Sequence, residues 1–313
     1  MANAGATLRA GFTTVRDVGT YRGGIDVSLW NAIDQGQVPG PRMAVAGPCV
    51  TKPGGGGEVT GPPNGAFAPP EFRLGAAASP EEVRAPVAEI LGRGANFIKV
   101  IATGAVLTVG TDVGAMECSE AALRAGVRSI EHGSLLDDEG IALMAERGTW
   151  LVADIYNGDY IKVIGRRDHW PEETLRKNDE TTETQRATSR KAVAAGVRIG
   201  YDADVGGYPH GENAKQFQYM VRYGMTPMQA IQSATIEAAR PMGWEERVGS
   251  MAVGKWADLV AVRGHPIQDI SIQDISTLEQ VDIVIKGRSI PRNGETSDEQ
   301  CTASIRSGGG VVA

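Results

Sequence analysis

The sequence predicts an α/β protein in which repeated βα units build a parallel sheet, with a small β-rich section near the C-terminal end. Three observations predict this class. Apolar β-like runs alternate with helical stretches. The run at residues 97–103 is continuously apolar apart from one lysine, as in strands that are buried on both faces. The alternation ends after residue 246, where strand-like runs form a section of their own.

Six apolar runs are the predicted strands of the parallel sheet. In chain order they are residues 12–18, 42–48, 97–103, 127–133, 150–156 and 197–204. Helical stretches lie between them, and a parallel neighbour is usually reached through such a helical crossover.

Three of the intervening helices carry clear signals. Residues 79–94 begin with an N-cap serine and have a proline in the first turn. Residues 136–148 close with a glycine, the usual residue in the left-handed turn that ends a helix. A long polar helix is expected over residues 171–196, directly before the last strand.

The C-terminal part of the chain changes character. Two more helices, residues 213–224 and 226–243, lead into two strands of a small separate sheet, within residues 249–264 and 281–287. The tail from Asn293 onward is polar and rich in glycine and serine, and it is expected to be disordered. The predicted organisation has three parts: a main domain (1–246), a β-sheet appendage (247–292) and the tail (293–313).

Composition and charge narrow the function. The 313 residues are 42% hydrophobic and 22% charged, and the net charge of −7 with scattered Lys and Arg argues against a nucleic-acid partner. No apolar run reaches the roughly 18 residues that a membrane span needs. The first residues lack a signal-peptide pattern, and Cys49, Cys118 and Cys301 form no metal-like pattern. We expect reduced thiols and a cytoplasmic protein.

Metal-competent side chains fall near the carboxyl ends of the predicted strands. Lys99 lies in the third run, His132 ends the fourth and Asp202 ends the sixth. A lysine in such an apolar run must reach water or be neutralised, because an unpaired buried ammonium is very costly. In a (β/α)8 barrel the active site forms at the carboxyl ends of the strands. These residues are therefore the predicted site, and His210 follows after a short loop.

Six motifs resemble the metal-dependent amidohydrolase superfamily, in particular its branch of imidazolonepropionase-like enzymes and prolidase-like Xaa-Xaa dipeptidases. They are "GFTTVRDVG", "FIKVIATG", "SIEHGSLLDDEGIALMAERG", "YPHGENAKQF", "GMTPMQAIQSAT" and "VGKWADLVAV". The resemblance runs almost continuously from about Thr7 to Gly287. It implies a (β/α)8 TIM-type barrel and a hydrolase.

The resemblance also implies roles for the candidate residues. Lys99 would be carboxylated by CO2, and this carbamate would bridge two divalent metals, with zinc the expected metal. The alternative is a lysine that extends to water at the barrel mouth. His132 would be a metal ligand, and Asp202 would contact metal and take a proton from the attacking hydroxide. Tyr156 and His210 match positions that contact substrate in relatives, although either one is equally compatible with a surface role.

One departure from the family pattern leaves the acidic residue open. Relatives read "GTDAGVYPHG" where this chain reads "GYDADVGGYPHG". Tyr201 replaces a threonine, two glycines lengthen the loop, and Asp204 is an extra carboxylate. Asp202 keeps the register, but Asp204 is a rival that the sequence does not exclude.

Two expected parts of a binuclear site are missing from the sequence. The family has an H-x-H pair on strand 1 and a histidine on strand 5, but the four histidines here are His132, His169, His210 and His265. The 33 residues from Lys99 to His132 have room for one βα step, whereas the family has two. A junction is predicted within residues 115–126. We therefore expect an incomplete barrel of about six strands, in which the Lys99 strand lies beside the His132 strand.

The predicted function is hydrolysis of an amide bond in a dipeptide-like or N-acyl amino acid substrate, by metal-activated hydroxide with Asp202 as the base. The alternative is a truncated or degenerate relative that binds without catalysis. With only Lys99, His132 and Asp202 as remaining ligands, we expect this chain to be inactive or nearly so, with Lys99 as a free amine that pairs with Asp202. The sequence leaves a homo-oligomer open.

Overall fold

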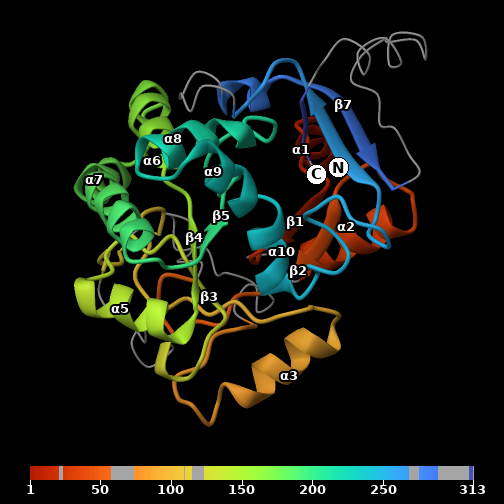
Figure 1. Ribbon diagram of the computed structural model, residues 1–313. Helices are drawn as coiled ribbons and strands as arrows, with labels where there is room; N and C mark the ends of the chain where they lie inside the picture. The colour runs from red at the N-terminus through yellow and green to blue at the C-terminus, as the bar shows by residue number, and fades with distance from the viewer. Residues whose placement is uncertain are drawn as a thin grey trace.

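The computed structural model places five parallel strands in two separate sheets (Figure 1). It describes residues 1–20, 24–57, 74–108, 110–114, 123–267, 275–287 and 310–312. In the first sheet β1 (Thr14–Asp17) pairs with β2 (Arg42–Val45). In the second the order is β3 (Ser129–Glu131), β4 (Trp150–Ala153) and β5 (Ile199–Tyr201). All five lie within predicted runs, and the described residues show no closed barrel.

The Lys99 run departs from the prediction. It forms no regular strand, because only isolated bridges involve residues 97–103. Its backbone lies beside the continuation of β2, where the Val50 amide donates to the Lys99 carbonyl and the Ile101 amide donates to the Val50 carbonyl, both at 2.8 Å. The expected pairing with the His132 strand is not among the strand pairs of the described residues. The Lys99 segment therefore extends the β1–β2 sheet.

Helices occupy most of the predicted positions. They are α1 (Ala2–Arg9), α2 (Ile25–Asp34), α3 (Arg84–Gly92), α5 (Asp138–Arg147), α6 (Asn157–Tyr160), the π-helix η2 (Ile161–Gly165), α7 (Glu172–Ala194), the short helix η3 (Asn213–Lys215), α8 (Gln216–Arg222), α9 (Pro227–Ser233), α10 (Ile236–Met242) and the short helix η4 (Ser276–Glu279). Gly148 ends α5 in the left-handed conformation, as predicted. Ser79 does not cap α3, which begins at Arg84; its hydroxyl accepts instead from the Glu82 amide in the preceding turn. None of the helices in the described ranges is long and apolar enough to cross a membrane.

Two buried clusters fix the sheets against their helices. The larger one packs β4 and β5 against α5, α8 and α9, through Leu151, Ile199, Met144, Phe217 and Ile231. In Figure 1 these helices gather around the second sheet. The smaller cluster joins β2 to α1 and α2. Burial of such aliphatic and aromatic side chains stabilises the fold by roughly 1.5–3 kcal/mol each.

An ion pair connects the two parallel sheets. The guanidinium of Arg16, on β1, lies 2.7 Å from the Glu131 carboxylate on β3 and also donates to the Ser129 hydroxyl. Both charged side chains are largely buried, at 15% and 7% exposure. This contact holds the two sheets together at the level of their strand ends, where the site forms.

The C-terminal sheet is antiparallel, with β6 (Asp258–Val262) between β7 (Val281–Lys286) and β8 (Gly310–Val312). Within the tail, Gly310–Val312 pair with β6; the other tail residues lie outside the described ranges, and the disorder expected for the tail stays a prediction. Arg42 on β2 forms an ion pair of 3.0 Å with Asp258. The appendage is thus tied directly to the first parallel sheet.

A buried carboxyl at the end of β1 makes stability depend on pH. Burial raises the pKa of Asp17 to about 6, with a smaller contribution from the charge of Asp26, against an opposing hydrogen bond from the Gly19 amide. The folded-state pKa lies above the unfolded value of 3.8, so the stabilisation by the bound proton is complete below pH 3.8 and is lost as the pH rises through about 6. We expect Asp17→Asn to be more stable than wild type at pH 8 by up to roughly 3 kcal/mol.

The measurement is the free energy of urea unfolding of both proteins at pH 4.5 and pH 8. The advantage of Asp17→Asn should be small at the lower pH and grow at the higher one. Exposed Asp34→Asn is the matched control and should show no such change. If the free energies of unfolding of Asp17→Asn and wild type differ by the same amount at both pH values, ionisation of Asp17 does not destabilise the folded protein.

Candidate metal-binding active site

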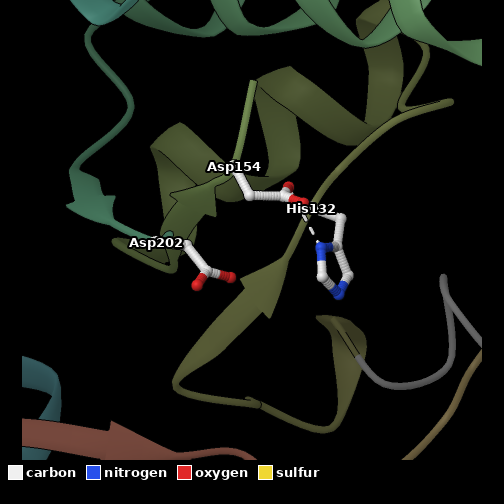
Figure 2. A group of neighbouring side chains, drawn as sticks. All are labelled: His132, Asp154 and Asp202. Carbon is white, nitrogen blue, oxygen red and sulfur yellow. Dashed lines mark ion pairs between the residues drawn. The ribbon is translucent and has the colours of Figure 1, made fainter. Parts of the chain in front are cut away.

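Three side chains converge at the carboxyl ends of three neighbouring strands. His132 directly follows β3, Asp154 directly follows β4 and Asp202 directly follows β5. Each offers one ligand atom, and these atoms all lie within 4.8 Å of one another. Figure 2 shows the imidazole and the two carboxylates directed toward a common space. Parallel strands bring their ends to one edge of the sheet, so residues 70 positions apart in sequence meet here.

His132 forms an ion pair with Asp154. Its Nδ1 lies 3.0 Å from Asp154 Oδ1, while the histidine side chain remains 40% exposed. The residue adopts a positive φ of 66°, so the chain turns sharply as it leaves β3. Burial alone would lower the pKa of His132, but the charge and hydrogen bond of Asp154 raise it to about 10. A cation that binds the imidazole must therefore displace a proton.

Asp154 is held on both sides by amide side chains. It is 2% exposed; Oδ1 accepts from Gln185 Nε2 at 2.8 Å, and Oδ2 accepts from Asn157 Nδ2 at 2.6 Å. Gln185 belongs to α7, whose buried face is unusually polar and also contacts the segment after β4 through Asn178 and Arg186. These contacts fix the orientation of the carboxylate toward the cluster.

Asp202 and Asp204 lie in one loop but have different partners. Asp202 Oδ1 accepts from the Asp204 backbone amide at 2.8 Å. Burial, with the charges of Asp154 and Asp204, raises the pKa of Asp202 to about 7. Asp204 has a φ of 44° and accepts from Asn157 at 3.2 Å, and its pKa is also raised by burial. The geometry groups Asp202, rather than its rival, with His132 and Asp154.

Lys99 lies beside this cluster without joining it. Its positive charge acts on His132 and Asp204 and works to lower the pKa of both. The side chain is partly buried, and across the described ranges no ion pair joins it to Asp202, contrary to the expected pairing. The three grouped ligand atoms come from the other predicted residues and from Asp154.

The two predicted substrate residues occupy different surroundings. The Tyr156 ring packs edge-on against Tyr208, with centroids 5.0 Å apart, and the Lys215 ammonium lies 5.8 Å from its centre. His210 is half-buried and its Nδ1 lies 2.9 Å from the Thr7 hydroxyl on α1. Tyr156 is thus linked to the loop that carries Asp202, whereas the contact of His210 is with the first helix.

Asp154 is the residue that sequence reasoning missed. The run at 150–156 was a predicted strand, and Asp154 follows its apolar part just as His132 and Asp202 follow theirs. The same rule applied to every strand end would have selected it. The signal was present in the sequence, whereas the family pattern indicates Tyr156 in this run.

The three residues fit a single divalent ion. Catalytic zinc sites commonly have three protein ligands and one open position, and imidazole and carboxylate groups are both zinc ligands. The two carboxylates concentrate negative charge in a largely buried place, which raises the pKa of Asp202 and favours a cation there. Hydrogen bonds from Gln185 and Asn157 supply the outer contacts that orient a ligating carboxylate.

Comparisons with known proteins agree with this architecture. A Xaa-Pro dipeptidase structure with methionine in its active site aligns with a TM-score of 0.86 and 35% identity, over 93% of this chain and 78% of that chain. The structure of ochratoxinase from Aspergillus niger aligns with a TM-score of 0.76 and 26% identity, over 95% of this chain and 77% of that chain. Such neighbours have an α/β fold of the TIM-barrel type.

Sequence relatives give the same picture. Ochratoxinase from Aspergillus niger is 28% identical over 307 residues, which cover 85% of this chain and 62% of that protein. An imidazolonepropionase from Fusobacterium nucleatum is 26% identical over 145 residues, 45% of this chain and 30% of its own length. The chain therefore spans less than two thirds of the ochratoxinase it matches.

The family match itself falls into two segments. The model of the amidohydrolase family matches residues 1–127 and 115–295, which together include most of the chain. The two segments overlap at residues 115–127, and the junction predicted from the sequence falls within 115–126. Residues 115–122 lie outside the described ranges. On the strength of these matched segments, the chain belongs to the amidohydrolase family.

Proposed function

We propose that this chain hydrolyses an amide bond in a dipeptide-like or N-acyl amino acid substrate at the cluster of His132, Asp154 and Asp202. One observation carries the proposal: an imidazole and two carboxylates meet within 4.8 Å at the carboxyl ends of three neighbouring strands, in a member of the amidohydrolase family. Prolidase and ochratoxinase neighbours support an amide as the bond that is cleaved.

His132, Asp154 and Asp202 would hold one divalent ion, with zinc the proposed metal. Such an ion, when bound, supplies a water of lowered pKa and polarises a carbonyl oxygen. The expectation of an inactive chain counted Lys99, His132 and Asp202 as the remaining ligands. In that set Lys99 is a free amine and does not bind metal. Asp154 supplies a third ligand that needs no carboxylated lysine, so we propose activity. Carboxylation of Lys99 stays a prediction.

Asp202 would move the protons. This carboxylate would accept a proton from the attacking water and return it to the departing amine nitrogen. The C–N bond then breaks with the nitrogen protonated, and the carboxyl product keeps the water oxygen. Tyr156, beside the Asp202 loop, is proposed to contact the substrate; His210, on the α1 side, is proposed to contact its outer part.

The test is a panel of Xaa-Pro dipeptides and N-acyl amino acids, assayed with and without added Zn²⁺ and bicarbonate, alongside elemental analysis of the protein. We expect turnover that needs about one metal per chain, from the three-ligand site, and that Asp202→Asn abolishes. The control is His265→Ala, which removes an exposed histidine and should leave both readouts unchanged. Bound metal without hydrolysis of any amide would refute the hydrolase and favour the binding protein. Mass spectrometry with ¹³C-bicarbonate reports on Lys99 separately.

A further inference from the structure

Tyr208 lies in the loop that follows β5, between Asp204 and His210. It is 4% exposed. Its ring stands edge-on to Tyr156, with centroids 5.0 Å apart and an interplanar angle of 84°, and packs at 5.8 Å against Tyr160. The loop backbone folds back on itself, because the Gly206 amide donates to the Tyr208 carbonyl at 3.3 Å. The position of this side chain is thus fixed by packing on two sides.

The hydroxyl of Tyr208 is buried and has no hydrogen-bond partner among the described residues. Buried tyrosine hydroxyls normally find a partner, so this group needs an explanation. Burial, followed by the charges of Asp202, Asp154 and Asp204, raises the pKa of Tyr208. The hydroxyl therefore keeps its proton and remains a donor, and the charges that act on it are those of the carboxylate cluster.

The nearby carboxylates already have donors of their own. Asp154 accepts from Gln185 and Asn157 on its two oxygens, and Asp202 accepts from the Asp204 amide. Asn157 also donates to Asp204. The Tyr208 hydroxyl, by contrast, donates to none of these side chains.

We propose that Tyr208 donates a hydrogen bond to the carbonyl oxygen of the amide that the cluster hydrolyses. The inference rests on the proposed function and adds a substrate-contacting residue to it. Attack on the amide places negative charge on that oxygen, and a fixed donor in a buried site stabilises such charge more than it stabilises the neutral substrate. Because Tyr208 is held by ring packing, it needs little reorganisation as the charge develops.

The main test is Tyr208→Phe, which removes only the hydroxyl and keeps the ring contacts. Loss of one such donor lowers kcat by about 100-fold in comparable sites. We expect a loss of that size in kcat and in kcat/KM, with an unchanged metal content and an unchanged melting temperature. Tyr160→Phe is the matched control, because Tyr160 packs on the same ring. It should retain wild-type kinetics.

A binding measurement separates this proposal from the proposed function. The probe is a phosphonamidate analogue of an N-acyl amino acid, whose phosphorus is tetrahedral and whose oxygens carry negative charge. We expect Tyr208→Phe to bind it about 100-fold more weakly than wild type, while binding of the free amino acid product is unchanged. If wild type binds the probe but hydrolyses nothing, the proposed function fails and the Tyr208 contact is still decided by this titration.

Two outcomes would overturn the inference. Equal kinetics and equal probe binding in Tyr208→Phe would show that the hydroxyl does not touch the reacting group. A rise in KM at constant kcat would show a contact made equally in the ground state, such as with a substrate carboxylate, and not with the reacting oxygen.

Discussion

Replacing Asp154 by asparagine should weaken Zn²⁺ binding by on the order of 100-fold or more, because it removes one of the three proposed protein ligands. The change preserves the shape of the side chain, which sits 2% exposed between Gln185 and Asn157. It also places an amide NH2 next to one of those donors, so the orientation of residue 154 is lost together with its charge. Amide hydrolysis should fall with the metal.

The measurement is a competition titration of Zn²⁺ against a chromophoric chelator, with Co²⁺ spectra as a second view of the coordination sphere. The control is Asp168→Asn, which removes an exposed carboxylate that pairs with Arg167 on the surface. NMR titration of His132 gives a readout that is independent of metal. Because Asp154 is the largest of the influences that raise the pKa of His132, the imidazole of the variant should titrate well below 10. A Zn²⁺ affinity within threefold of wild type would remove Asp154 from the site.

Replacing Arg186 by methionine should lower the free energy of unfolding by about 1–3 kcal/mol, the cost of leaving a buried carbonyl oxygen without its donor. The Arg186 side chain is 6% exposed. Its guanidinium donates to the Ile155 carbonyl, forms an ion pair of 2.9 Å with Asp159 and stacks over Tyr219. These contacts link α7 to the segment after β4, so the loss also disturbs Asp154.

Urea unfolding of the wild type, Arg186→Met and Arg176→Met decides the point. Arg176 is on the same helix, but it is more than half exposed and pairs with Glu180 one turn away, so its replacement should cost less than about 1 kcal/mol. A loss for Arg186→Met no larger than that of the control would mean that water substitutes for its buried contacts.

The sequence predicted the parts of the fold that depend on local pattern. Strands β1 to β5 and α7 follow from apolar runs and helical stretches. The run around Lys99 has an equally apolar pattern, yet it forms only bridges with the end of β2. Whether an apolar run becomes a regular strand depends on the partners on either side, which are set by tertiary structure. β8 is the opposite case, because three residues of the tail, for which no strand was predicted, form a strand by pairing with β6.

The site was predicted in part for a related reason. His132 and Asp202 follow the carboxyl ends of predicted strands. Parallel strands bring these ends to one edge of the sheet, and the structure places the two side chains together there. Their third partner, Asp154, follows the apolar part of the strand between them in the sheet order β3-β4-β5, so the same strand-end rule would have selected it. The unpaired hydroxyl of Tyr208 could not be predicted from the sequence, because the lack of a hydrogen-bond partner depends on how the surrounding side chains pack.

The two hydrogen bonds of Asn157 have an energetic consequence. By donating to both Asp154 and Asp204, this amide holds like charges near each other that would separate in the unfolded chain. Repulsion between these carboxylates therefore lowers the free energy of unfolding, a loss of stability that is common at functional sites. A cation that binds the cluster offsets this repulsion, and its binding free energy further stabilises the folded state. The melting temperature would then rise with the concentration of the metal ion, so that the stability of the protein reports how much metal is available.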